Sequence, residues 1–250
     1  MDPLLGYRRF FGDPSWGTKL LAASLLYLTG MCVPLVGQLA VDGWVALVTR
    51  EAVRGEDEEL PPLDWDFDYL VKLLILGTFT LLVRLVWQLP VYFLMVAVGM
   101  TAMIVGVAGA AADPERAWLA IALGLSVLVA GGLLCLVLMV PGMVAIFRVQ
   151  VSGDLGKAFE FGAILDYTKR TFFAVVGYHL VAFVVAIPIV FAGMLLCGLG
   201  SIPALVIVQV GVAFVFVRIH ERQLAAGGPE IPLGPRELPH PHRPTPPRAF

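Results

Sequence analysis

Three ionisable side chains lie well inside the long apolar runs of this sequence: Asp42, Arg84 and His179. Within lipid, an unpaired charge costs roughly 3 kcal/mol or more, so it is normally paired or faces a polar cavity. Arg84 and Gln209 are candidate partners for Asp42, and Gln88 lies on the same helical face as Arg84, four residues away. The five residues therefore predict an intramembrane polar site.

The chemistry of this site stays open at the level of sequence. Two roles are open for Asp42: it forms a proton or ion site, or it is an interfacial acid with a purely structural role. Arg84 suits contact with a lipid headgroup or a substrate, because a long basic side chain can reach the membrane surface. A single His179, with no acid or cysteine near it in sequence, is more typical of a hydrogen bond between packed helices.

An acidic stretch, "RGEDEELPPLDWDFD" at 54–68, is the second feature that could bind a ligand. The alternate acids of "DWDFD" resemble the start of a calcium loop, which would require Gly at its sixth position and Glu at its twelfth. Tyr69 and Ile75 occupy those positions, so the match fails. A looser divalent site and a docking surface remain alternatives, but we interpret the stretch as the point where the chain leaves a membrane.

Other catalytic and metal-binding patterns are missing from the sequence. The cysteines, Cys32, Cys135 and Cys197, lie in apolar segments without CxxC or Cys/His spacing. GxSxG, HExxH and P-loop motifs do not occur. We expect no enzyme activity, cofactor or metal. Basic residues mixed with aromatic ones occur only beside apolar runs, so we also expect no nucleic-acid partner.

Composition indicates an integral membrane protein. The 250 residues are 59% apolar and 14% charged, against roughly 25% charged in soluble domains. Mean hydropathy is +0.87. The charges gather in clusters separated by apolar runs of the kind that lipid accepts. These clusters lie at 2–19, 50–72, 113–116, 148–170 and 218–248.

The apolar runs predict an all-α bundle of about six transmembrane helices, arranged as three hairpins with short interfacial amphipathic helices. "CVPLVGQ" at 32–38 interrupts the first run, which is either one kinked span or a hairpin of 19–33 and 36–53. Pro90 divides the second run into 69–88, predicted to be interfacial, and a span at 91–111. Further spans are predicted at 117–147, 173–197 and 202–220, with an amphipathic stretch at 148–173 before the last two.

Basic residues prefer the cytoplasmic side of a membrane, which favours a scheme with both termini in the cytoplasm. In the alternative scheme 19–48 crosses once, and 71–89 and 91–111 form a hairpin about Pro90. This scheme would place Arg50, Arg54 and Lys72 outside. Arg8, Arg9, Trp16 and Trp65 are predicted interfacial anchors. The membrane domain is predicted to cover 1–224, followed by a proline-rich disordered cytoplasmic tail at 225–250.

Several motifs resemble a prokaryotic membrane family called domain of unknown function 4013. They are "RRFFGDPSWGTKLL", "VTREAVRGEDEELPPLDWD", "DLGKAFEFGAILDYTKR" and "CGLGSIPALVIVQVGVAFVFVRIHERQL", and the likeness covers about 1–224. The loop has an extra Pro and Asp, and 91–147 matches only in hydrophobicity. The resemblance implies a multi-pass inner-membrane protein without an assigned activity.

The function that we expect is a non-enzymatic one, in which the protein organises or partners other membrane components. Its partners would be membrane lipids and other membrane proteins or further copies of itself. A small-solute or lipid transporter or channel is the alternative. It would use helices broken at prolines together with Asp42, Arg84 and Gln209.

Overall fold

The computed structural model describes residues 5–32, 35–55, 59–63, 65–112, 117–195 and 200–235. In these ranges every regular element is helical. The helices are α1 (Leu5–Gly12), α2 (Trp16–Cys32), α3 (Val36–Val53), α4 (Phe67–Ala112), α5 (Ala117–Ser152), the short 3₁₀ helix η2 (Leu155–Phe159), α6 (Phe161–Leu195) and α7 (Ser201–Ala225).

Four helices are long and apolar enough to cross a membrane: α4, α5, α6 and α7. The prediction of an all-helical membrane fold is therefore supported by four candidate spans. α2 and α3 are not among them. At 1.5 Å per residue their 17 and 18 residues span about 26 and 27 Å, slightly less than a hydrocarbon core of about 30 Å.

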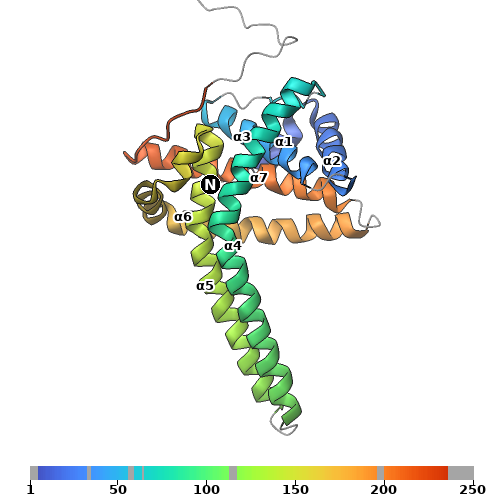
Figure 1. Ribbon diagram of the computed structural model, residues 1–250, viewed down its shortest axis with the longest axis vertical. Helices are drawn as coiled ribbons and strands as arrows, with labels where there is room; N and C mark the ends of the chain where they lie inside the picture. The colour runs from blue at the N-terminus through green and yellow to red at the C-terminus, as the bar shows by residue number, and fades with distance from the viewer. Residues whose placement is uncertain are drawn as a thin grey trace, which may run out of the picture.

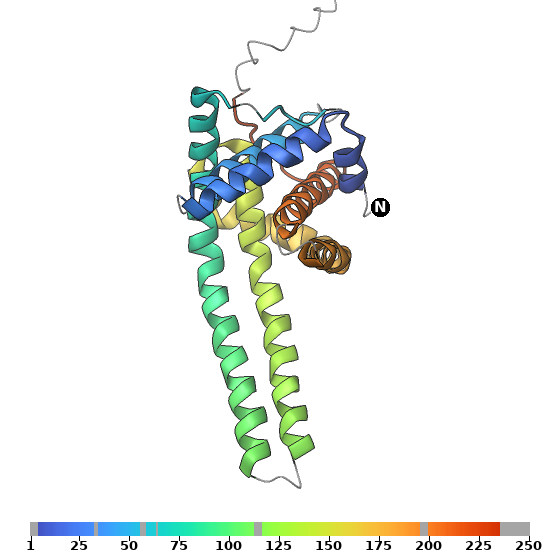
Figure 2. The ribbon, with the colours of Figure 1, turned by 90° about the vertical axis from the view of Figure 1, so that its right-hand side faces the viewer.

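α4 and α5 form a long antiparallel hairpin that extends away from the rest of the molecule (Figures 1 and 2). α4 has 46 residues and continues through Pro90, so the division into 69–88 and 91–111 is wrong. Pro141 lies inside α5 and Pro188 inside α6 in the same way. Helices in membranes tolerate proline where neighbouring groups satisfy the freed backbone carbonyl.

The first apolar run forms two helices, α2 and α3, which pack against each other. This is the hairpin rather than the single kinked span. The break is visible at Leu35, whose φ of 74° is in the left-handed region that branched side chains avoid. Residues 33–34 lie outside the described part of the chain.

A compact head lies at one end of the α4–α5 hairpin and is formed by α1, α2, α3 and α7 (Figure 1). The α6–α7 hairpin runs crosswise to the α4–α5 hairpin. α3 is the centre of this head, because most of its length is buried. Trp44 and Val41 are fully enclosed there. α1 packs on α7, where the ring of Tyr7 occupies the space in which Gly211 lacks a side chain.

The amphipathic stretch at 148–173 is not one helix. It comprises the end of α5, η2 and the start of α6. Gly153 allows the turn between α5 and η2 because its φ is +67°. Asp154 then caps η2 by accepting a hydrogen bond from the N–H of Gly156 at 2.8 Å.

The segment after α7 differs from the disordered tail predicted at 225–250. Residues 226–235, which we call the strap, lie against the head, and Ile231 is buried. Gly234 donates its N–H to the carbonyl of Val151 at 3.0 Å, and its own carbonyl accepts from Arg54 Nη2 at 2.6 Å. Residues 236–250 lie outside the described part of the chain.

Candidate functional site

Two glycines bring the backbones of α3 and α4 into direct contact. A β-carbon on Gly43 would lie 2.0 Å from the carbonyl oxygen of Leu73. A β-carbon on Gly77 would lie 1.8 Å from that of Leu39. In each helix the glycine follows the leucine by four residues, so both lie on one face. The contact is reciprocal and leaves no room for a side chain at either glycine.

Asp42 and Arg84 pair beside this crossing. Arg84 Nη1 donates to Asp42 Oδ2 at 3.0 Å, and Nη2 donates to Oδ1 at 3.3 Å. Asp42 is only 3% exposed, while the side chain of Arg84 keeps 27% of its surface. Such a two-pronged pair is the strongest geometry for these groups. It neutralises the Asp42 charge where burial would otherwise make it costly.

Tyr27 and Gln209 add two further helices to the site. Gln209 Nε2, on α7, donates to the hydroxyl of Tyr27, on α2, at 3.0 Å. The Tyr27 hydroxyl lies near the charges of Asp42 and Arg84, although no hydrogen bond joins it to either among the described residues. Residues from four helices, Asp42, Arg84, Tyr27 and Gln209, therefore lie near one another. Gln209 binds Tyr27 rather than Asp42. Tyr27 was missed because an isolated tyrosine carries no pattern in the sequence.

Two of the predicted site residues lie elsewhere. Gln88 accepts a hydrogen bond from the Tyr92 hydroxyl at 3.3 Å and faces α5. The Nδ1 atom of His179 lies 2.8 Å from the carbonyl oxygen of Val175, one turn earlier in the same helix. The His179 ring packs against Phe216. Both residues therefore contribute to packing between helices, and neither is hydrogen-bonded to the Asp42–Arg84 pair in the described part of the chain.

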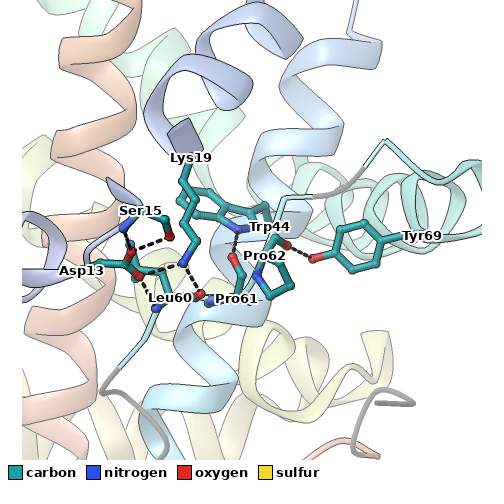
Figure 3. A network of polar contacts seen from close by, with 8 residues as sticks. All are labelled: Asp13, Ser15, Lys19, Trp44, Leu60, Pro61, Pro62 and Tyr69. Carbon is teal, nitrogen blue, oxygen red and sulfur yellow. Dashed lines mark hydrogen bonds and ion pairs between the residues drawn. The ribbon is translucent and has the colours of Figure 1, made fainter. Parts of the chain in front are cut away.

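A second polar network fixes the start of the loop between α3 and α4. Three consecutive carbonyl groups, at 60–62, each accept a hydrogen bond from a different element (Figure 3). The donors are Lys19 Nζ, Trp44 Nε1 and the Tyr69 hydroxyl, at 2.6, 3.0 and 2.6 Å. We call this arrangement the loop clip. It holds the loop to α2, α3 and α4 together.

Asp13 organises the loop clip from the turn before α2. Its carboxylate accepts from the N–H and hydroxyl of Ser15 at 2.7 Å each, from Lys19 Nζ at 2.7 Å and from the N–H of Leu60 at 2.8 Å. The residue is only 1% exposed. Burial alone would raise the pKa of Asp13, but hydrogen bonds from Lys19, Ser15 and Leu60 hold it below its ordinary value.

The predicted interfacial anchors have different surroundings. Arg9 places its guanidinium 5.7 Å from the ring centre of Phe214, so it ties α1 to α7. Arg8 and Trp65 are exposed, and Trp16 is 37% exposed. Exposed aromatic and basic groups at the rim of the head suit the headgroup region of a bilayer.

Metal binding finds no support in the described ranges, where no group of three or more His, Cys, Asp or Glu side chains could hold an ion. Asp64 of the acidic loop lies outside those ranges. The N–H of Asp68 instead donates to Asp66 Oδ1 at 3.3 Å, a local turn contact.

An apolar groove of about 510 Å³ runs between α4 and α5 in the outer part of their hairpin. Small residues form much of its wall. It is lined by Gly99, Ala102, Met103, Gly106, Val107, Ala110, Ile121, Gly124, Leu125 and Leu128. Gly124 fits tightly against α4, since a β-carbon there would lie 2.7 Å from the Ala102 carbonyl oxygen. Gly99 and Gly106 are different, because a β-carbon on either would meet nothing within 4 Å.

Comparison with known proteins identifies a family but no characterised relative. No curated protein matches the chain, and no solved structure does. The family described as "Protein of unknown function (DUF4013)" matches residues 25–200. This range includes α3, α4, α5 and α6, together with the loop clip carbonyls and the Asp42–Arg84 pair. The match covers well over half of the sequence, and the chain belongs to the DUF4013 family.

Proposed function

We propose that the protein is a non-enzymatic, multi-pass protein of a prokaryotic inner membrane that partners other membrane components through its α4–α5 hairpin. In this proposal the outer part of the α4–α5 hairpin crosses the membrane, and both termini lie in the cytoplasm. Lipids surround the hairpin, and the partner is a helix of another membrane protein or of a second copy.

The projecting hairpin is the observation that carries this proposal. In the most apolar windows of both α4 and α5, only 11% of the residues are buried within the chain. Both helices leave the head and continue side by side without other support (Figure 2). Packing within the chain would leave room for a side chain at Gly99 and at Gly106. Small residues at such positions let helices in membranes approach closely.

The Asp42–Arg84 pair supports a structural interpretation of the polar site. Each charge is satisfied by the other, and the adjacent α3–α4 backbone contact fills the space beside them. A site that binds and releases an ion needs a group that is free to exchange partners. We therefore assign Asp42 and Arg84 the role of locking α4 to the head.

Photo-crosslinking in native membranes tests the proposal. A photoreactive amino acid at Met103, which lines the groove, is expected to give a discrete protein–protein adduct. Ile104 is the matched control, because it is the next residue and similarly exposed, at 59% against 68%, but does not line the groove. Adducts with lipid alone at both positions, or equal protein adducts at both, would contradict a specific contact at the groove.

Transport of a small solute or lipid is the alternative, favoured by the meeting of Asp42, Arg84 and Gln209 near Tyr27. It requires the polar groups to face a path across the membrane. Flux assays in liposomes distinguish the two functions. A flux abolished by Asp42→Asn in a correctly folded variant would support transport and would remove the structural role assigned above.

A further inference from the structure

A group of buried polar side chains lies where α5, α6, α7 and the strap meet, distant in sequence from the Asp42–Arg84 pair. Tyr167 comes from α6, and His220 and Gln223 come from α7. Tyr167 and His220 are 1% exposed, and Gln223 is 6% exposed. We call these three residues the buried polar cluster.

Five polar atoms of this cluster have no hydrogen-bond partner of good geometry among the described residues. They are the Tyr167 hydroxyl, both ring nitrogens of His220, and the amide oxygen and nitrogen of Gln223. The Gln223 amide lies close enough to the His220 ring to interact with it, but this contact lacks hydrogen-bond geometry. Each unsatisfied buried group costs about 1–3 kcal/mol, and folded proteins carry few of them per hundred residues. Five such atoms in one small region, at the ends of two helices, require a partner that the described residues do not supply.

The surroundings enclose the cluster and bring its members together. The His220 ring packs against Phe147 at 5.6 Å and against Tyr167 at 6.1 Å between ring centres. Where the strap begins, the N–H of Gly228 donates to the Gln223 carbonyl at 2.8 Å, so the chain turns back over the end of α7. The cluster is therefore closed to bulk solvent by aromatic rings on one side and by the strap on another.

The basic group near the cluster, Arg148, is already engaged. Arg148 precedes α6 in the chain and is buried, but its Nε donates to the Lys157 carbonyl at 3.1 Å and its Nη2 binds the Glu160 carboxylate at 2.5 Å. The cluster itself offers neutral donors and acceptors and a single histidine. This combination suits a small neutral ligand with both donors and acceptors, and it does not suit a metal or an anion.

We propose that the buried polar cluster binds ordered water molecules that bridge Tyr167, His220 and Gln223. One buried water usually makes about three hydrogen bonds, so a few molecules satisfy all five atoms. These waters are part of the fold at the junction of α6, α7 and the strap. The inference is independent of the function proposed for the α4–α5 hairpin.

Hydroxyl-radical footprinting of the full chain in lipid nanodiscs tests this inference, with ¹⁸O-labelled water as the probe. Radicals formed from a bound water react with side chains beside it, even when these are buried. Tyr167 and His220 are expected to incorporate label several-fold faster than Phe10 and Trp44, which are equally buried. Labelling of Tyr167 and His220 no faster than of those two controls would overturn the proposal.

A pair of variants keeps the test specific. Gln223→Leu removes two of the atoms that would hold water, so the labelling of Tyr167 is expected to fall several-fold. Thr171→Val is the matched control, since the Thr171 hydroxyl already donates to the Tyr167 carbonyl at 2.8 Å and has no role in the cluster. Equal loss of label in both variants would contradict the inference. If Gln223→Leu does not fold, the comparison within the wild-type chain remains decisive.

Discussion

Replacing Lys19 by Met should uncouple the loop clip from α2. The Lys19 ammonium group is largely buried and donates to Asp13 Oδ2 at 2.7 Å and to the Leu60 carbonyl at 2.6 Å. The methionine side chain has a length similar to that of lysine and replaces its apolar stem, but it cannot donate a hydrogen bond. The variant leaves a buried carboxylate without its counter-ion and a buried carbonyl without its donor.

The magnitude follows from the bonds that remain. Asp13 would keep the Ser15 N–H, the Ser15 hydroxyl and the Leu60 N–H, all neutral donors. Removing one partner of a buried ion pair usually costs about 3–5 kcal/mol, whereas an exposed pair contributes about 1 kcal/mol or less. We therefore expect Lys19→Met to lower the free energy of unfolding by about 3–5 kcal/mol at neutral pH.

The effect should depend on pH in a defined direction. The pKa of Asp13 is held below its ordinary value, so its stabilising contribution is present at neutral pH and is lost as the pH falls through that lowered pKa. In Lys19→Met, burial without the ammonium group raises the pKa of Asp13 relative to the wild type. The difference in stability between the two proteins should shrink as the pH is lowered below about 4.

Unfolding by denaturing detergent, followed through tryptophan fluorescence, measures this difference. Trp44 contributes to that signal, and its indole donates within the loop clip. Lys157→Met is the matched control. It breaks the Lys157–Glu160 pair, whose side chains are 28% and 41% exposed, and should cost about 1 kcal/mol or less. A cost for Lys19→Met that is equally small and independent of pH would refute the argument.

Further variants test the crossing of α3 and α4. Gly77→Val should destabilise the protein by about 3 kcal/mol, because the new β-carbon would collide with the Leu39 backbone. Gly99→Val is the control and should have little effect, because a β-carbon there meets nothing within 4 Å. Detergent-unfolding curves compare the two variants directly. Arg84→Met should cost about 3–5 kcal/mol by leaving Asp42 buried and unpaired. Asp42→Asn combined with Arg84→Met should recover part of that loss, and strict additivity of the two changes would argue against a direct pair.

The sequence was a good guide where the signal is a pattern of side chains. Long apolar runs predict spans, and "CVPLVGQ" predicts the break between α2 and α3 that the structure contains. Proline was a poor guide, since α4 continues through Pro90. Whether a proline breaks a helix depends on the groups packed around it, and a single sequence does not contain that information.

The two polar networks were only partly predictable. Asp42 and Arg84 are conspicuous because charges are rare in apolar runs, and they meet in the structure. The loop clip had no comparable signal, because its acceptors are the backbone carbonyls of residues 60–62, which every residue possesses. The strap was predicted to be disordered from its prolines, but Ile231 and the backbone of Gly234 bind it to the head.

Cysteine-accessibility labelling in intact cells tests most directly the claim that lipid surrounds most of this chain. Single cysteines at Arg116, Val107, Glu59 and Arg243, in a chain whose three natural cysteines are replaced by alanine, would be treated with a membrane-impermeant maleimide. We predict labelling at 116 alone, with 59 and 243 reacting only after the membrane is opened and 107 remaining protected. Labelling of 107 or 243 in intact cells would contradict the proposed arrangement.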